Sequence, residues 1–196
     1  RGVYILFEKR EIRSAFISVP RVVRIGTHMV SRGSKARLWN RLRTHRGHAD
    51  GRGNHRASVF RKHVGDALIQ RSKGKIHLTT WGQGQSATKE IQRQEECLEK
   101  EVSRYIGEMT ILWLAIPDEA GPDSDRSFIE KNAISLLSGI GRQVDPPSDK
   151  WLGIHSPTTV IRDSGLWNVD YTNYNYDNRF LGVLGKYVDA MAGERR

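Results

Sequence analysis

Short apolar runs alternate with longer amphipathic stretches along this chain, and their spacing predicts its secondary structure. Three runs rich in β-branched and aromatic residues indicate strands, at Gly2–Phe7, Arg21–Ile25 and Met109–Ile116. The third, MTILWLAI, carries the strongest strand signal. Glu8–Pro20 is a long connection between the first two, so a hairpin formed by them would have an elaborated loop.

Apolar residues at helical spacing predict helices between and after these strands. Ser34 can cap the first helix, which carries Leu38 and Leu42 on one face. The other helices are expected at His55–Arg71, Ser86–Ile106, Asp125–Ser138 and Asp177–Met191.

Two further segments follow neither period throughout. Ser72–Gln85 indicates a turn, a short strand and a second turn, whereas Thr158–Tyr176 indicates an irregular stretch of polar and aromatic residues. The order of two strands, helices, a third strand and another helix is typical of a small α/β domain. Because no linker divides the chain, we expect a single domain over 1–196, with 72–107 as an inserted subregion.

Positive charge is concentrated in one part of the chain. The formal net charge is +10, and the stretch from Arg32 to His63 holds ten Lys and Arg residues, one acid (Asp50) and four of the seven histidines. Such a block binds nucleic-acid phosphates through counterion release. A solvated basic surface without a specific ligand would have the same composition. The charge favours a nucleic-acid partner and indicates nothing about chemistry.

The apolar and cysteine content bears on the cellular compartment. The longest apolar run, Ile111–Ile116, is far too short to span a bilayer, and no signal segment precedes it. Cys97 is the single cysteine, so no intramolecular disulfide can form. These features predict a cytoplasmic protein, in a prokaryotic cytoplasm, without membrane association.

Two strand residues are candidates for chemistry. Tyr4 lies on the opposite face of its strand from Val3 and Ile5, and packing alone would explain it. Arg24 is less usual because it interrupts an apolar strand, where a guanidinium needs an anionic partner or an opening to solvent. A structural salt bridge and a phosphate contact are equally good explanations of Arg24.

Several residues of the basic block have a spacing that suits phosphate. Arg41 and His45 are four residues apart and share a helix face, although an ordinary basic helix surface looks the same. His55 follows a polar break at the start of a predicted helix, where backbone N–H groups favour an anion.

Glu130 is the carboxylate that we single out as a metal ligand. It lies at the edge of the expected buried stripe of its helix. The members of this stripe are Phe128, Ile129, Ala133, Leu136 and Leu137. Mg²⁺ needs one or two carboxylates when phosphate and water supply its other ligands. A surface glutamate paired with a lysine or arginine is the alternative. The sequence contains no paired-cysteine zinc spacing, no phosphate-binding G-x-x-x-x-G-K-[ST] and no G-x-S-x-G.

Taken in order, these residues resemble the GIY-YIG nuclease family. Gly2-Val3-Tyr4 looks like its first signature, and Arg24-Ile25-Gly26 stands where the second, Tyr-Ile-Gly, is expected. The other similar segments are the helix LWNRLRTH with Arg41 and His45, the polar turn Asn54-His55, the helix FIEKNAI with Glu130, and LWNV with Asn168.

The resemblance implies an α+β fold, with a three-stranded antiparallel sheet flanked by helices. Its core would comprise about 1–71 and 108–171, with a C-terminal helix at about 177–192. It departs from the family at Arg24, which replaces the usual tyrosine, and in the long gap between the two signatures.

The resemblance also implies a chemistry, namely hydrolysis of DNA phosphodiester bonds with one divalent cation, Mg²⁺ or Mn²⁺. Tyr4 would position or activate the attacking water, and Glu130 would hold the metal. Arg24 and Arg41 would stabilise charge on the phosphate, and His45 would orient water or phosphate. Further DNA contacts are expected from Arg37, Arg43, Arg52, His55, Arg56 and Asn168.

Two other hypotheses are also compatible with the sequence. Arg24 in the second signature is compatible with a nucleic-acid-binding module that kept the fold and lost the chemistry. The long helix at Ser86–Ile106 could instead serve a protein-interaction domain. Within the nuclease hypothesis, cutting both strands of a duplex with one small active site would require two copies, so a homodimer is a further expectation.

Overall fold

The computed structural model describes residues 1–16, 18–28, 37–142 and 145–193. Three strands, β1 (Gly2–Ile12), β2 (Pro20–Thr27) and β3 (Thr110–Ala115), form one antiparallel sheet in the order β2-β1-β3. The predicted three-stranded antiparallel sheet is therefore confirmed. β1 extends beyond the predicted Phe7, and register shifts interrupt its pairing with β2 between Leu6 and Phe7 and between Phe7 and Ile12.

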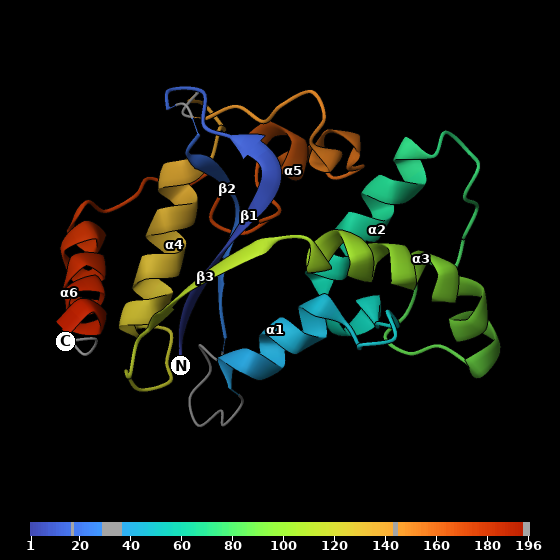
Figure 1. Ribbon diagram of the computed structural model, residues 1–196, viewed down its shortest axis with the longest axis horizontal. Coiled ribbons are helices and arrows are strands. Elements are labelled where there is room, and N and C mark those ends of the chain that lie inside the picture. The colour runs from blue at the N-terminus through green and yellow to red at the C-terminus, as the bar shows by residue number, and fades with distance from the viewer. Residues whose placement is uncertain (17, 29–36, 143–144, 194–196) are drawn as a thin grey trace.

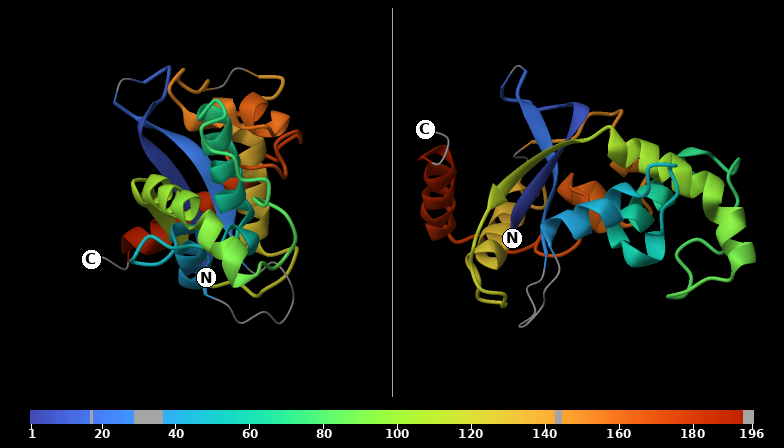
Figure 2. Two further views of the ribbon diagram at one scale, coloured as in Figure 1. Left: turned by 90° about the vertical axis from the view of Figure 1, so that its right-hand side faces the viewer. Right: turned by 60° about the horizontal axis from the view of Figure 1, so that its bottom comes forward.

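Helices cover both faces of this sheet (Figures 1 and 2). The helical segments within the described ranges are α1 (Leu38–Arg46), η1 (His55–Ala57), α2 (Val59–Arg71), α3 (Lys89–Gly107), α4 (Asp125–Leu137), η2 (Leu152–His155), α5 (Thr159–Ser164) and α6 (Arg179–Gly193). None of them is both long enough and apolar enough to cross a membrane.

The alternation of side chains along β1 creates two cores. Tyr4 and Leu6 point to the face covered by α1, α2 and α3, and both are buried there. Val3 points to the opposite face and packs with Ile129 and Ile134 of α4. Each fully buried side chain of this size stabilises the fold by about 1.5–3 kcal/mol. The sheet is thus held from both sides, which fixes the direction of every β1 side chain.

The helix starts depend on capping residues. Ser34, the predicted cap of the first helix, lies outside the described residues, and α1 begins at Leu38. The predicted helix His55–Arg71 is divided, because Ser58 is extended and its Oγ accepts the Arg61 N–H at the start of α2. Thr88 caps α3 in the same way, so that helix begins at Lys89 and not at Ser86.

Two predictions about irregular segments are wrong. Residues 72–85 contain no strand, since the apolar side chains Ile76, Leu78 and Trp81 each pack against the core without a neighbouring strand to pair with. The stretch 158–176 is not irregular throughout, because it includes α5, which ends at Gly165 with a left-handed φ of 69°.

The buried stripe of α4 also differs from the predicted one. Arg126, Asn132 and Ser135 are buried together with Ile129 and Ile134, whereas the other predicted members are only partly buried. These polar side chains are accommodated because partners reach them. Arg126 pairs with Asp118, and the side-chain oxygen of Asn132 accepts the backbone N–H of Asp177.

The Glu8 side chain connects three other segments to β1 through hydrogen bonds. Its carboxylate accepts hydrogen bonds from Trp151 Nε1 and Trp167 Nε1, each at 3.0 Å, and from the Tyr105 hydroxyl at 2.7 Å. Burial raises the pKa of Glu8, and the three hydrogen bonds oppose that rise. Because Trp167 adjoins Asn168, this carboxylate also anchors the segment that follows α5.

We expect Glu8→Ala to destabilise the protein by about 2–4 kcal/mol, because it leaves buried N–H and O–H donors without an acceptor. Glu8→Gln keeps one acceptor oxygen and removes the cost of burying a charge, so its effect should stay within about 1 kcal/mol. Urea unfolding at neutral pH measures both. Equal losses in the two variants would contradict this account of Glu8.

Candidate active site

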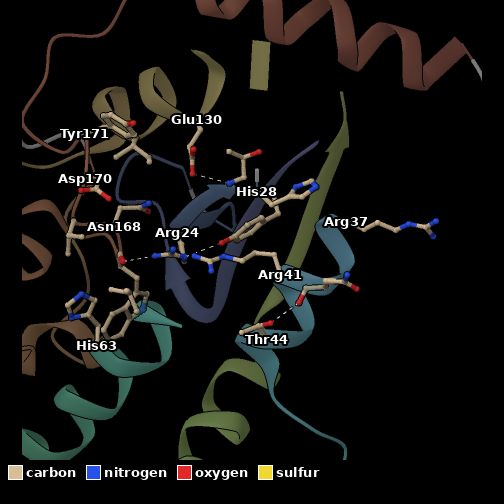
Figure 3. A pocket seen from close by; sticks show the side chains of 17 residues that line it. Arg24, His28, Arg37, Arg41, Thr44, His63, Glu130, Asn168, Asp170 and Tyr171 are labelled. Atoms are coloured by element: carbon tan, nitrogen blue, oxygen red, sulfur yellow. Dashed lines mark hydrogen bonds between the residues drawn. The ribbon is translucent and has the colours of Figure 1, made fainter. Parts of the chain in front are cut away.

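A cavity of about 580 Å³ with several charged side chains in its lining opens beside the sheet, between α1, α2, α4 and the segment that follows α5 (Figure 3). The residues that line it are Tyr4, Arg24, Thr27, His28, Arg37, Asn40, Arg41, Thr44, Val59, His63, Glu130, Ile134, Trp167, Asn168, Val169, Asp170 and Tyr171. It therefore gathers side chains from distant parts of the chain.

Tyr4 occupies the floor of the cavity and is held by its strand neighbours. Its register partner on β2 is Gly26, and a Cβ at Gly26 would lie only 2.3 Å from the Tyr4 hydroxyl oxygen. Only glycine allows the tyrosine ring to lie over the neighbouring strand in this way. The hydroxyl lies 2.9 Å from His45 Nε2 and accepts a long hydrogen bond, 3.4 Å, from Arg24 Nε.

Arg24 is fixed at the cavity by contacts on several sides. Its Nη1 donates to the Trp167 carbonyl at 2.7 Å, and its guanidinium carbon lies 4.6 Å from the centre of the Phe60 ring. Neither contact neutralises its charge. Arg24 therefore presents a positive charge to the cavity beside Tyr4, and no salt bridge of the described residues involves it.

His45 lies behind Tyr4, is buried and is not among the residues that line the cavity. Its Nδ1 is 2.8 Å from the Ser58 hydroxyl. Burial, together with the positive charges of Arg24, Arg41 and Arg61, lowers the pKa of His45 to about 2. The imidazole is therefore neutral at physiological pH.

Glu130 projects from α4 on the opposite wall from the arginines (Figure 3). Its Oε1 accepts the Thr27 N–H at 2.9 Å, and Oε2 receives no hydrogen bond from the described residues. Burial raises the pKa of Glu130, whereas the Thr27 hydrogen bond, Arg24 and Arg41 oppose that rise. The result is a partly buried carboxylate with one oxygen available to a cation.

This donor set fits a Mg²⁺ or Mn²⁺ ion that retains water and phosphate ligands, which needs only one or two protein carboxylates. Within the described ranges, no three His, Cys, Asp or Glu side chains gather to form a complete protein cage. Of the two carboxylates that line the cavity, Asp170 is exposed, whereas Glu130 is partly buried and oriented by Thr27, so Glu130 is the residue that would hold such an ion.

Asn168 connects the cavity wall to the sheet. Its Oδ1 accepts the Ile25 N–H at 3.1 Å, and its Nδ2 donates to the Ile25 carbonyl at 2.8 Å. Both ends of its amide are engaged by one strand residue, so its contacts hold the wall in place and leave little capacity for a ligand.

The structure brings only some of the sequence-predicted residues together. Tyr4, Arg24, Arg37, Arg41, Glu130 and Asn168 line the cavity, and His45 contacts it through Tyr4. Arg43 is exposed on α1 but lies outside the cavity lining, and the exposed Arg52 pairs with Asp50 at 2.6 Å.

His55 and Arg56 have structural partners away from the cavity. His55 is buried, stacks on Trp81 and lies 2.9 Å from Glu99 through Nδ1, while its Nε2 accepts the Gly82 N–H. Arg56 makes two hydrogen bonds to Glu95. Both acids lie on α3, so carboxylates of this helix neutralise part of the positive charge of the basic block.

Sequence reasoning missed several residues of the lining. Asn40 and Thr44 share a helix face with Arg37 and Arg41, since the four positions follow helical spacing, and that signal was available in the sequence. His63 of α2 also lines the cavity, and burial lowers its pKa. Nothing in its local sequence distinguishes it from the other histidines of the block.

The sheet, its flanking helices and the cavity define an α+β domain whose site combines tyrosines, arginines and two carboxylates, Glu130 and Asp170. The family model described as GIY-YIG domain matches residues 1–194, so the chain belongs to the GIY-YIG family, a family of nucleases that act on nucleic acid. No curated protein and no solved structure gave a significant match. Whether 72–107 is an insertion in the family module stays a prediction.

The low pKa of His45 predicts acid sensitivity of the fold. The unfolded state recovers the ordinary value of 6.5, so between that pH and the folded value it binds more protons than the folded state. The stabilising contribution is complete above about pH 6.5 and declines as the pH falls below it.

We therefore expect the wild-type free energy of unfolding to fall from about pH 7.5 to about pH 5 more steeply than that of His45→Gln. Urea titrations at several pH values measure this. His48→Gln, which removes an exposed histidine of the same region, should retain the wild-type slope. The same slope in wild type and His45→Gln would contradict the assignment.

Proposed function

We propose that this protein is a metal-dependent endonuclease that hydrolyses phosphodiester bonds in DNA. The observation that carries the proposal is the convergence of Tyr4, Arg24, Arg41 and Glu130 on one cavity. These side chains supply a proton acceptor, two cations and a metal ligand, which are groups that can promote phosphodiester hydrolysis. Membership of the GIY-YIG family supports the same reaction class.

Tyr4 is proposed to position the attacking water and to take a proton from it. Its side chain lines the cavity, and its oxygen lies beside the neutral His45 imidazole and the positively charged Arg24 guanidinium. The Tyr4 oxygen can accept a proton from the water once its own proton has left to solvent. Gly26 and His45 keep the oxygen in place.

Arg24 and Arg41 are proposed to bind the scissile phosphate and to stabilise the additional negative charge of the transition state. Both line the cavity without a carboxylate partner among the described residues. Fixed cations in a partly water-excluded site stabilise developing charge more than solvent does. Arg24 would thus offer the phosphate a positive charge at the position where the signature tyrosine would offer a hydroxyl group.

Glu130 is proposed to hold one Mg²⁺ or Mn²⁺ ion. When bound, such an ion would supply Lewis-acid stabilisation of the departing oxygen. Thr27 orients the carboxylate through its N–H, and Asn168 holds the adjacent wall against β2.

The surface proposed to bind DNA includes only some of the residues of the basic block. Asn40, Arg41 and Thr44 of α1 line the cavity together with Arg37, which directly precedes the helix, and Arg43 is exposed on α1. Arg56 and Arg61 pair with Glu95 and Glu99, so we do not assign DNA contacts to them. One cavity cuts one strand, and a double-strand break would require a second copy.

We expect Mg²⁺- or Mn²⁺-dependent nicking of supercoiled plasmid, and its loss in Glu130→Gln. Arg41→Ala should reduce the rate by about 100-fold, because one charge-stabilising group is removed. Glu119→Gln, which changes an exposed glutamate just before α4, should cut at the wild-type rate.

Nicking that persists in Glu130→Gln and resists EDTA would contradict the metal assignment. If no DNA is cut while salt-sensitive binding persists, the alternative favoured by Arg24 applies, in which the protein binds nucleic acid without cutting it.

The α1 surface makes a separate prediction about DNA binding. In the absence of divalent metal, Arg37→Ala and Arg43→Ala should each reduce the slope of log affinity against log salt concentration by about 1. Fluorescence anisotropy over a range of NaCl concentrations measures this slope. Arg93→Ala, which removes an exposed arginine from α3, should leave it unchanged; equal effects of all three substitutions would place the DNA elsewhere.

A further inference from the structure

Ser58 lies behind the cavity and takes part in a buried chain of hydrogen bonds. Its Oγ accepts the Arg61 N–H at 3.2 Å and lies 2.8 Å from His45 Nδ1. His45 Nε2 lies 2.9 Å from the Tyr4 hydroxyl, which also accepts the Arg24 Nε–H. The chain thus runs from a helix cap, through an imidazole, to the oxygen proposed to activate water.

Hydrogen-bond accounting decides the direction of this chain. A neutral imidazole carries one N–H, so one ring nitrogen donates and the other accepts. If Nδ1 donated to Ser58, the serine oxygen would accept two N–H groups, and its own hydrogen would have no acceptor among the described residues. Ser58 is buried, and a buried donor without an acceptor costs about 1–3 kcal/mol.

The opposite direction leaves only the Tyr4 hydroxyl hydrogen without an acceptor among the described residues. Tyr4 lines the cavity, where water can accept that hydrogen, whereas Ser58 is not among the lining residues. The Ser58 hydroxyl accepts from Arg61 N–H and donates to His45 Nδ1, so the ring proton is on Nε2. From there it is donated to the Tyr4 oxygen, which then accepts from His45 and from Arg24. The tyrosine's own proton must point away from both donors, toward the cavity.

We propose that Ser58 is a positioning residue that fixes the tautomer of His45, so that the Tyr4 oxygen receives two N–H donors and its own proton faces the cavity. The catalytic consequence rests on the proposed function, whereas the tautomer does not. Two donors hold the Tyr4 oxygen in place. Once the tyrosine's own proton has left through the cavity to solvent, that oxygen takes a proton from the attacking water.

This direction also defines what His45 does not do. Taking the tyrosine proton would make His45 an imidazolium, which burial and three nearby arginines disfavour, as its lowered pKa indicates. His45 therefore acts as a hydrogen-bond donor to Tyr4, and the tyrosine proton leaves through the cavity to solvent.

The tautomer can be measured directly in metal-free protein. Long-range ¹H–¹⁵N correlation spectra of ¹⁵N-labelled protein distinguish protonated from unprotonated ring nitrogens, and His45→Gln identifies the His45 signals. We expect a protonated Nε2 and an unprotonated Nδ1 in the wild type. A protonated Nδ1 would overturn the proposal without any need for a variant.

Variants then test the part played by Ser58. Ser58→Ala removes the donor to Nδ1 and should move its resonance downfield, whereas Ser58→Thr should retain the wild-type position. Thr88→Ala is the matched control, because Thr88 caps α3 in the same way and has no contact with His45. An unmoved Nδ1 resonance in Ser58→Ala would overturn the assignment.

The kinetics of plasmid nicking distinguish the role of Ser58 in positioning His45 from its role as the cap of α2. Ser58→Ala should lower kcat roughly tenfold, a part of what a positioned proton-transfer group contributes, with little change in KM. Ser58→Thr should restore the rate, and Thr88→Ala should retain it. Equal losses in Ser58→Ala and Thr88→Ala would overturn the catalytic consequence. If the wild type cuts no DNA, the proposed function fails while the tautomer result still stands.

Discussion

The close contact between Tyr4 and Gly26 is the constraint on which the site depends. Antiparallel pairing of β1 and β2 sets these two residues opposite one another, and the missing side chain of Gly26 leaves room for the tyrosine ring. The ring then lies between His45 and Arg24, with its oxygen at the cavity. Any other residue at position 26 would displace the ring and, with it, the contacts of both basic side chains.

The cavity owes its electrostatic character to a separation of charges on two walls. Arginines from α1 and β2 lie on one side, and Glu130 of α4 lies on the other. The sheet holds these walls apart because each of its faces is covered by a different set of helices. A phosphate and a divalent cation are complementary to such a pair of walls, and this complementarity connects the fold to the proposed reaction.

The basic residues that are close together in the sequence do not all contribute to one basic surface in the structure. Glu95 and Glu99 of α3 pair with His55 and Arg56 of η1 and with Arg61 of α2, so these side chains connect α3 to η1 and α2. Because burying two charges costs desolvation free energy, such pairs add little net stability, but removing one partner would leave the other charge buried and unpaired. The charge that faces the cavity comes instead from α1 and from Arg24.

The sequence by itself determined the sheet, most of the helices and the residues whose roles follow from local spacing. Strand alternation predicted the direction of Tyr4, and helical spacing placed Arg41 beside His45 and Glu130 at the edge of a buried stripe. Only the tertiary structure decided which basic residues face the cavity, because the partners of His55 and Arg56 lie 44 and 39 residues away. The link between Ser58 and His45, and the engagement of both ends of Asn168 by Ile25, were likewise decided by packing, since no local pattern in a sequence encodes contacts between separate elements.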